Sequence, residues 1–273
     1  MNNFFSRTIT GILFVILIVG SILLSQYLFA SLFLVITILG ILEFNNLVEK
    51  DNIKPQKIIG IIVGSALFVS SALFALNLID GSILLLNIPL FFVIFIIELF
   101  RKTEKPFTNI AYTLLGIIYV ALPFSLLNFF FTPGSTTGDE YHPAILLGFF
   151  LLIWMNDTTA YLIGIWLGKH RFFERISPKK SWEGFIGGTI FTLILAYILS
   201  IYFDEFNLLQ WLIITIIVVV FGVLGDLVES IFKRSINCKD SGTIFPGHGG
   251  ILDRFDSVLL ATPFVFTYVI MFS

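Results

Sequence analysis

Stretches of apolar residues, separated by short polar segments, run through almost the whole chain. A membrane-spanning helix needs about 20 apolar residues to cross a hydrocarbon core of about 30 Å, and most of these stretches are long enough. The pattern therefore predicts an all-α, polytopic integral membrane protein with about nine transmembrane helices. The predicted spans cover residues 9–24, 27–42, 58–79, 83–100, 108–131, 143–168, 185–203, 208–232 and 251–272.

The first two apolar stretches are separated only by Ser25 and Gln26. A single helix over both would be about 50 Å long, at 1.5 Å per residue, which is too long for one span. We therefore expect a tight hairpin around residues 20–26. A cleaved signal peptide beginning near Arg7 is an alternative, but no A-x-A cleavage site follows it.

Composition supports a membrane protein. The 273 residues are 57% hydrophobic and 16% aromatic, with a mean hydropathy of +0.99, which exceeds what a soluble domain can bury. No soluble domain or repeat stands out, so the chain is read as one multi-pass domain, 1–273. Within it we expect a helical scaffold at 1–140 and catalytic helices and loops at 141–273. The lone Cys238 cannot form an intrachain disulfide.

The distribution of charge predicts the topology. With nine spans, all 16 Lys and Arg residues fall on one side of the membrane, and the opposite loops hold only acids. By the positive-inside rule the N-terminus is then cytoplasmic and the C-terminus external. If the first two spans were a single one, only Arg7 would lie on the wrong side. The acids of the opposite loops are Asp80, Asp139, Glu140, Asp204 and Glu205.

A few acidic residues lie within the apolar stretches. Glu43 and Glu98 are at predicted helix ends, where we expect solvated carboxylates. Asp157, beside Asn156, lies near the middle of a span, where a carboxylate costs at least about 2.5 kcal/mol and must face the bundle interior. It would either line a polar cavity open to the cytoplasm or brace two helices through a buried hydrogen bond.

Small residues follow Asp157 at intervals of four, which predicts close packing of this helix against a neighbour. They are Ala160, Gly164 and Gly168.

The loop after this span contains the sequence S-P-K-K-S-W-E-G at residues 177–184. Ser181 is expected to cap the next helix, with an acidic residue in its first turn. Lys179 and Lys180 beside a helix N-terminus favour phosphate binding. Trp182 is interpreted as an interfacial anchor.

Charged residues are densest between residues 226 and 256. One helix end carries a polar stripe, and the next helix begins with an acidic face, joined to it by a short loop. If the faces converge, their carboxylates suit Mg²⁺ together with phosphate oxygens and water. The stripe is formed by Asp226, Glu229, Ser230 and Lys233, and the second face by Asp253, Asp256 and Ser257.

Gly249 and Gly250 are expected to leave backbone N–H groups open for an anion at the start of the last helix. The alternative is an ion-paired interface with nothing bound, in which Asp226 pairs with Lys233 and Asp253 with Arg234.

Residues 230–256 resemble the signature of the CDP-diacylglycerol synthases (phosphatidate cytidylyltransferases). Two further features of that family are D-x-x-A-Y-x-x-G-x-x-x-G-K at Asp157 to Lys169 and the 177–184 sequence. The resemblance covers roughly the last 120 residues. Its signature is matched by Ser230, Phe232, Lys233, Arg234, Lys239, Asp240, Gly242, Phe245, Pro246, His248, Gly249, Gly250, Asp253, Arg254 and Asp256.

The resemblance implies transfer of a cytidylyl group from CTP to phosphatidic acid, giving CDP-diacylglycerol and pyrophosphate. It also implies a two-cation centre with Mg²⁺ and a monovalent ion such as K⁺. The principal metal ligands expected are Asp226 and Asp253, with Asp256 supporting directly or through water, and Lys233 and Arg234 complete the catalytic set. The expected substrate-binding residues are Ser177, Lys179, Lys180, Ser181, Lys239, His248, Gly249, Gly250 and Asp157.

The same resemblance suggests a homodimer in the bacterial cytoplasmic (inner) membrane, with the active site facing the cytoplasm. CTP would enter from the cytoplasm and the lipid sideways from the bilayer, and no nucleic acid partner is expected. Two other functions stay open. A related enzyme could use CTP to phosphorylate a polyprenol or phytol, and the intramembrane aspartates could belong to an ion-coupled transporter.

Overall fold

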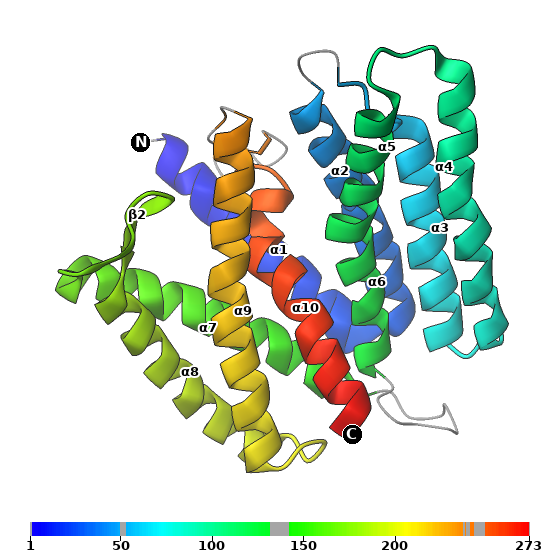
Figure 1. The fold of residues 1–273 in the computed structure, drawn as a ribbon. Coiled ribbons are helices and arrows are strands. Elements are labelled where there is room, and N and C mark those ends of the chain that lie inside the picture. Colours follow the sequence, from blue (N-terminus) through cyan, green and yellow to red (C-terminus); the bar gives the residue numbers. More distant parts are fainter. Residues whose placement is uncertain are drawn as a thin grey trace. The chain divides into compact units, whose positions relative to one another are not determined.

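We analysed a computed structural model of the chain, which describes the backbone of residues 2–49, 53–131, 142–236, 238, 241–242 and 249–272 and the side chains of these from residue 11 onward. The described residues are almost entirely helical, as predicted (Figure 1). The α-helices are α1 (Asn2–Leu24), α2 (Gln26–Val48), α3 (Lys57–Ala75), α4 (Asn87–Arg101), α5 (Pro106–Gly116), α6 (Leu122–Leu127), α7 (Pro143–Leu167), α8 (Trp182–Tyr202), α9 (Leu208–Ser235) and α10 (Leu252–Phe272). Shorter helical turns are η1 (Gly81–Leu86), η2 (Ile117–Ala121) and η3 (Asn128–Phe131).

Eight of the nine predicted membrane spans are found as long apolar helices, and the first is found as a shorter one. Among the described residues, eight helices are long and apolar enough to cross a membrane, and Gly11–Leu24 is a shorter apolar helix. Large apolar side chains such as Leu99, Phe100 and Trp166 are 78–83% exposed, as expected of helices that face lipid. The eight spans are Gln26–Val48, Lys57–Ala75, Gly81–Arg101, Pro106–Phe131, Pro143–Leu167, Trp182–Tyr202, Leu208–Ser235 and Leu252–Phe272.

The predicted break between the first two helices is at Ser25. This residue has an extended backbone (φ −172°, ψ 138°), and its side chain accepts a hydrogen bond from the Tyr27 N–H. Ser25 therefore acts as the N-cap of α2 and ends the helical run that would otherwise be too long for one span.

The chain divides into two compact units. The first contains Met1–Tyr141 together with Asp240–Phe255, and the second contains His142–Lys239 and Asp256–Ser273. The loop before α10 and the first turn of that helix therefore fold with the N-terminal helices, although they are more than 100 residues away from them in sequence.

Aromatic side chains form the core of the first unit. Phe33 packs against Phe29, with ring centroids 4.2 Å apart, and against Phe124 at 5.6 Å. Phe255, in the first turn of α10, contacts both Phe33 and Phe124 edge to face, at 5.8 and 5.1 Å. All four rings are at most 1% exposed, so they hold the start of α10 in this core.

The span Pro106–Phe131 contains one irregularity. The π-helical turn η2 ends two residues before Pro123, and the Leu122 N–H donates to the Ile117 carbonyl, five residues earlier. A wider turn relieves the clash of the proline ring with the preceding backbone, which lets the helix continue past Pro123.

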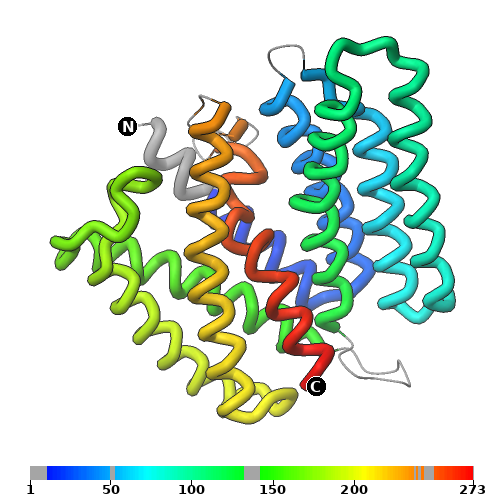
Figure 2. The backbone as a smooth tube through the Cα atoms, in the orientation of Figure 1, coloured from blue at the N-terminus to red at the C-terminus, as the bar shows by residue number. Residues whose placement is uncertain are grey.

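In the second unit, α7 and α8 pack along the predicted stripe of small residues. An added Cβ at Gly184 would come within 2.6 Å of the Ala160 carbonyl oxygen, and one at Gly188 within 2.9 Å of the Ala160 side chain. The expectation of close packing at Ala160 and Gly164 is therefore confirmed, with glycines of α8 as partners. Figure 2 follows these two helices, in green and yellow-green, from the α7 start to the α8 end.

The loop between α7 and α8 forms an antiparallel hairpin of β1 (Arg171–Phe173) and β2 (Ser177–Ser181), which was not predicted. Phe172 anchors it, because its ring contacts Trp182 edge to face at 4.3 Å and stacks on Phe185 at 5.3 Å. The hairpin thereby presents the S-P-K-K-S sequence as a strand that leads directly into α8.

Candidate active site

The predicted cap of α8 is confirmed. Ser181 is 4% exposed, and its Oγ accepts a hydrogen bond from the Gly184 N–H at 3.2 Å. Because Ser181 ends β2, successive residues before it point to opposite faces of the strand. Lys180 is accordingly half-buried, whereas Lys179 is exposed, and only Lys180 turns toward the helices of the second unit.

Lys180 forms an ion pair with Asp226 of α9. Its Nζ lies 2.8 Å from Asp226 Oδ2 and 3.5 Å from the Val223 carbonyl oxygen. Asp157 of α7 is exposed and lies within electrostatic range of both members of the pair. The structure thus brings together three predicted site residues from β2, α9 and α7. The two roles considered for Asp157, lining a polar cavity and bracing two helices, both stay predictions.

Asp256 on α10 lies close to the same acids. It is within electrostatic range of Asp226, Glu229 and Asp157, and its Oδ1 accepts the Ser257 N–H at 2.7 Å. The close approach of α9 and α10 depends on Gly225, because an added Cβ there would overlap the Asp256 carbonyl. A glycine directly before Asp226 therefore allows these two helices to place their aspartates near each other.

The polar stripe on α9 does not contain the ion pair of Asp226 with Lys233 that was considered as an alternative. Lys233 Nζ lies 2.6 Å from Glu229 Oε2, and Ser230 Oγ donates to Asp226 Oδ1 at 3.3 Å. The ion pair partner of Lys233 is thus Glu229, and that of Asp226 is Lys180. Arg234 is exposed at the end of the helix.

Asp253, in the first unit, binds the backbone at two points of the loop before α10, at residues 241 and 250. Its Oδ2 accepts the N–H groups of Ser241 at 3.0 Å and of Gly250 at 2.9 Å, and its own N–H donates to Ser241 Oγ at 3.3 Å. The expectation that Gly250 leaves its N–H open for an anion is wrong, because this N–H already has a carboxylate partner. Gly249 adopts a left-handed conformation (φ 81°) that turns the chain toward Asp253.

Glu43 is the main residue that sequence reasoning missed. The expectation of a solvated carboxylate is wrong, because Glu43 is 5% exposed and accepts hydrogen bonds from Ser241 Oγ at 2.5 Å, Ile251 N at 2.8 Å and Leu252 N at 3.0 Å. An acidic residue inside an apolar stretch was the available signal, since a carboxylate at such a position needs partners.

The same expectation is wrong for Glu98, which is 4% exposed. Four donors surround its carboxylate at 2.6–2.8 Å, so its charge is compensated inside the first unit. They belong to Gln56, Arg101, Thr103 and Asn109.

Two predicted substrate-binding residues, Lys239 and His248, lie outside the described residues. Ser177 begins β2 and is half-buried.

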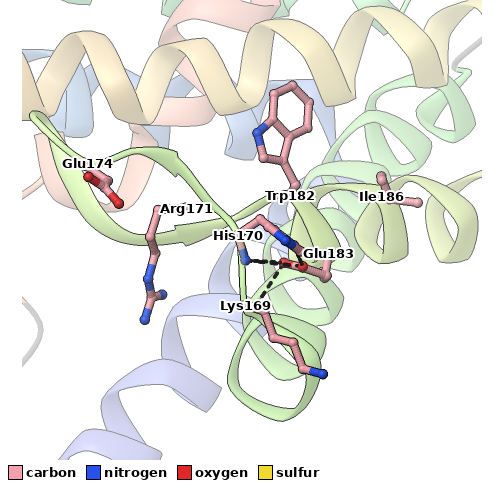
Figure 3. A pocket seen from close by; sticks show the side chains of 7 residues that line it. All are labelled: Lys169, His170, Arg171, Glu174, Trp182, Glu183 and Ile186. Atoms are coloured by element: carbon pink, nitrogen blue, oxygen red, sulfur yellow. Dashed lines mark hydrogen bonds and ion pairs between the residues drawn. The ribbon is translucent and has the colours of Figure 1, made fainter.

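A pocket of about 640 Å³ opens beside the hairpin (Figure 3). Glu183 organises its wall, since its carboxylate accepts the backbone N–H groups of Lys169 and His170 and contacts His170 Nδ1 at 2.6 Å. Neither Lys179 nor Lys180 lines this pocket, so it is not the phosphate site predicted at these two lysines. The lining residues are Lys169, His170, Arg171, Glu174, Trp182, Glu183 and Ile186.

The donors near Asp226 suit a hard divalent cation. The possible metal ligands are the carboxylate oxygens of Asp226 and of the nearby Asp157 and Asp256. The Lys180 ammonium shows that a positive charge is held against Asp226 Oδ2. Among the described residues, no group of three or more acidic, His or Cys side chains could hold a metal alone. Mg²⁺ is usually bound through one or two carboxylates plus phosphate oxygens and water, so the Asp226 and Asp256 pair fits it.

Comparison with known proteins identifies the family. The family model described as "Cytidylyltransferase family" matches residues 5–272. The chain belongs to the cytidylyltransferase family. Such an enzyme is a nucleotidyltransferase, and an ion-coupled transporter is no longer a competing interpretation.

Individual relatives of this cytidylyltransferase match either nearly the whole chain or about two thirds of it. A phosphatidate cytidylyltransferase of Staphylococcus haemolyticus is 36% identical over 264 residues, which cover 94% of this chain and 95% of the relative. Phosphatidate cytidylyltransferases of Staphylococcus saprophyticus and Staphylococcus aureus are 44% and 42% identical over 178 residues, 64% of this chain and 65% of each relative.

Proposed function

We propose that this protein transfers the cytidylyl group of CTP to phosphatidate, producing CDP-diacylglycerol and pyrophosphate for phospholipid synthesis. The proposal is supported by the match of the family model to residues 5–272 and by similarity to phosphatidate cytidylyltransferases of three staphylococci. The observation that carries it is the Lys180–Asp226 pair with Asp157 and Asp256 in electrostatic range. A cation beside several carboxylates is the arrangement that can bind a nucleotide triphosphate together with its metal.

The reaction is a substitution at the α-phosphorus of CTP. An oxygen of the phosphatidate phosphate forms the new P–O bond, and the bond between the α-phosphorus and the bridging oxygen breaks. The electron pair of that bond leaves with pyrophosphate. The attacking oxygen is already ionised, so no side chain is assigned as a general base. Catalysis then depends on holding two anions in line and compensating their charge.

The residues divide this work by their chemistry. Asp226 and Asp256 would hold Mg²⁺, which would compensate phosphate charge and orient the triphosphate. Asp253, three residues before Asp256 in α10, is the other principal ligand predicted from the sequence. Lys180 would leave Asp226 and bind a phosphate oxygen of CTP, and Lys179, Lys233 and Arg234 are proposed to add positive charge. Lys239 and His248 remain candidates for the same role.

We place the reaction on the cytoplasmic face of a bacterial inner membrane. All 16 Lys and Arg residues lie on one side in the nine-span topology, including those proposed to bind phosphate. CTP would thus reach them from the cytoplasm. Phosphatidate would enter between helices from the bilayer, since its acyl chains are costly to expose to water.

The test uses purified protein with α-labelled CTP and phosphatidate, with and without Mg²⁺. The expected result is a labelled CDP-lipid and one pyrophosphate for each lipid formed, in the presence of Mg²⁺ only. A phosphorylated lipid alcohol with release of CDP would instead identify a lipid kinase. Absence of the CDP-lipid with every divalent cation supplied would overturn the proposal.

A further inference from the structure

The buried carboxylate of Glu43 lies between Ser241, in the loop before α10, and the start of α10 at Ile251 and Leu252. We infer that Glu43 is a positioning residue, which fixes this loop and the start of α10 and thereby sets the position of Asp253. The inference rests on the proposed function only in so far as Asp253 is needed for cytidylyl transfer. Glu43 is in α2, outside every motif found in the sequence.

The hydrogen bonds of Glu43 reach both ends of the loop. Its Oε1 accepts Ser241 Oγ at 2.5 Å and Leu252 N at 3.0 Å, and its Oε2 accepts Ile251 N at 2.8 Å. These partners are 198 to 209 residues away in sequence. One side chain of α2 thus binds residue 241 and, eleven residues further along, the start of α10.

Helix α10 needs this contact because its own sequence lacks an N-cap. The Ile251 carbonyl accepts the first bonds of the helix, from Arg254 N and Phe255 N, so Ile251 occupies the cap position. Its apolar side chain cannot accept the free N–H groups of the first turn. Glu43 supplies the missing acceptor, and its negative charge is favourable at the positive end of the helix.

The adjacent glycines fit the same interpretation. An added Cβ at Gly250 would overlap the Glu43 carboxylate, and one at Gly242 would come within 2.7 Å of Glu43 Oε2. This chain therefore has glycines where the Glu43 carboxylate touches the backbone. The close approach requires residues without a side chain at these two positions.

Ser241 links Glu43 to Asp253. Its Oγ donates to Glu43 and accepts the Asp253 N–H, while its N–H donates to Asp253 Oδ2. Moving Ser241 would therefore disturb both the backbone and the carboxylate of Asp253. Residues that orient a metal ligand in this way typically change activity by about 10- to 100-fold when they are replaced.

The test compares Glu43→Gln with Glu98→Gln. Glu98 is equally buried in the same unit and accepts four hydrogen bonds, but none of them comes from this loop. In Glu43→Gln, an NH₂ group would face backbone donors at Ile251 or Leu252. We expect faster hydrogen exchange at these two amides in the metal-free protein, a higher Mg²⁺ concentration at half-maximal activity, and turnover reduced about 10- to 100-fold.

Glu98→Gln is expected to lower the melting temperature but to leave exchange at residues 251–252 and the Mg²⁺ dependence unchanged. Ser241→Ala, which keeps Glu43, gives a second measurement should Glu43→Gln not fold, and a smaller change in the same direction is expected. Unchanged exchange and turnover in Glu43→Gln or Ser241→Ala would overturn the inference while leaving the proposed function intact. If Glu43→Gln shows faster exchange but the wild-type protein forms no CDP-lipid, the role of Glu43 as an anchor is supported and the proposed cytidylyl transfer is refuted.

Discussion

Lys180 of β2 and Asp226 of α9 are joined by an ion pair of 2.8 Å between Nζ and Oδ2, and their side chains are 25% and 37% exposed. Pairs as accessible as this contribute at most about 1 kcal/mol, because water screens the charges. The pair can therefore open at little cost. A nucleotide bound with its metal would offer phosphate oxygens to Lys180 and a divalent cation to Asp226, so that each group exchanges one partner of opposite charge for another.

Replacing Lys180 by Ala is accordingly expected to lower kcat/KM for CTP by roughly 100-fold, the usual loss when a group that stabilises developing charge is removed. The measurement is initial-rate kinetics with CTP varied at saturating phosphatidate. Lys57→Ala is the control, because Lys57 pairs with Glu49 in the first unit and has no assigned role. Wild-type kinetics for Lys180→Ala would exclude this lysine from the site.

The membrane helices could be predicted to within a few residues, and some of them almost residue by residue. The apolar stretch 208–232 became α9 (Leu208–Ser235), and 143–168 became α7 (Pro143–Leu167). In a membrane, a helix satisfies its own backbone polar groups, so a long apolar stretch has few other conformations available. The cap at Ser181 and the close contact at Ala160 were also predictable, because both depend on residues near each other in sequence or on a simple spacing.

Interactions between distant segments could not be predicted. The partners of Glu43 are about 200 residues away, so its apolar surroundings in the sequence indicate that it needs partners but not which residues they are. The two lysines of the hairpin looked equivalent, and only the strand, which was not predicted, separates Lys180 from Lys179. Glycines at 249 and 250 suggested a site open to an external anion. The carboxylates of Asp253 and Glu43 instead accept the N–H groups of Gly250 and Leu252.

The packing of α7 against α8 can be tested at Gly184. An Ala Cβ there would press on the Ala160 carbonyl, a backbone atom that cannot move away easily. We expect Gly184→Ala to destabilise the protein by about 1–3 kcal/mol, as overpacking usually does. The measurement is thermal unfolding in detergent.

Gly20→Ala is the matched control for this variant. A Cβ at Gly20 in α1 has nothing within 4 Å, and alanine favours the helix by up to about 1 kcal/mol over glycine. Its melting temperature should be equal to or above that of the wild type. Equal stability of the two variants would show that α7 and α8 are not packed as closely as described.

The orientation in the membrane can be tested with single cysteines. In a Cys238→Ser background, Lys179→Cys should react with an impermeant maleimide in inverted vesicles but not in intact cells, because its loop is predicted to be cytoplasmic. Asp204→Cys, in a loop predicted to be external, should show the opposite. Labelling of Lys179→Cys from outside the cell would contradict the assignment of the active site to the cytoplasmic face.

Asp253 combines a structural and a proposed chemical role, and two substitutions can separate them. Its Oδ2 accepts the backbone N–H groups of Ser241 and Gly250. Asn keeps one oxygen acceptor for these bonds but lacks the negative charge needed to hold Mg²⁺, so Asp253→Asn should stay folded and lose turnover. Asp253→Ala also loses the acceptor and leaves these two backbone N–H groups without it, so it should be inactive and less stable by about 1–3 kcal/mol. CDP-lipid formation and thermal unfolding measured on the same samples distinguish the roles. Full activity in Asp253→Asn would remove this residue from the metal site and leave it with the structural role alone.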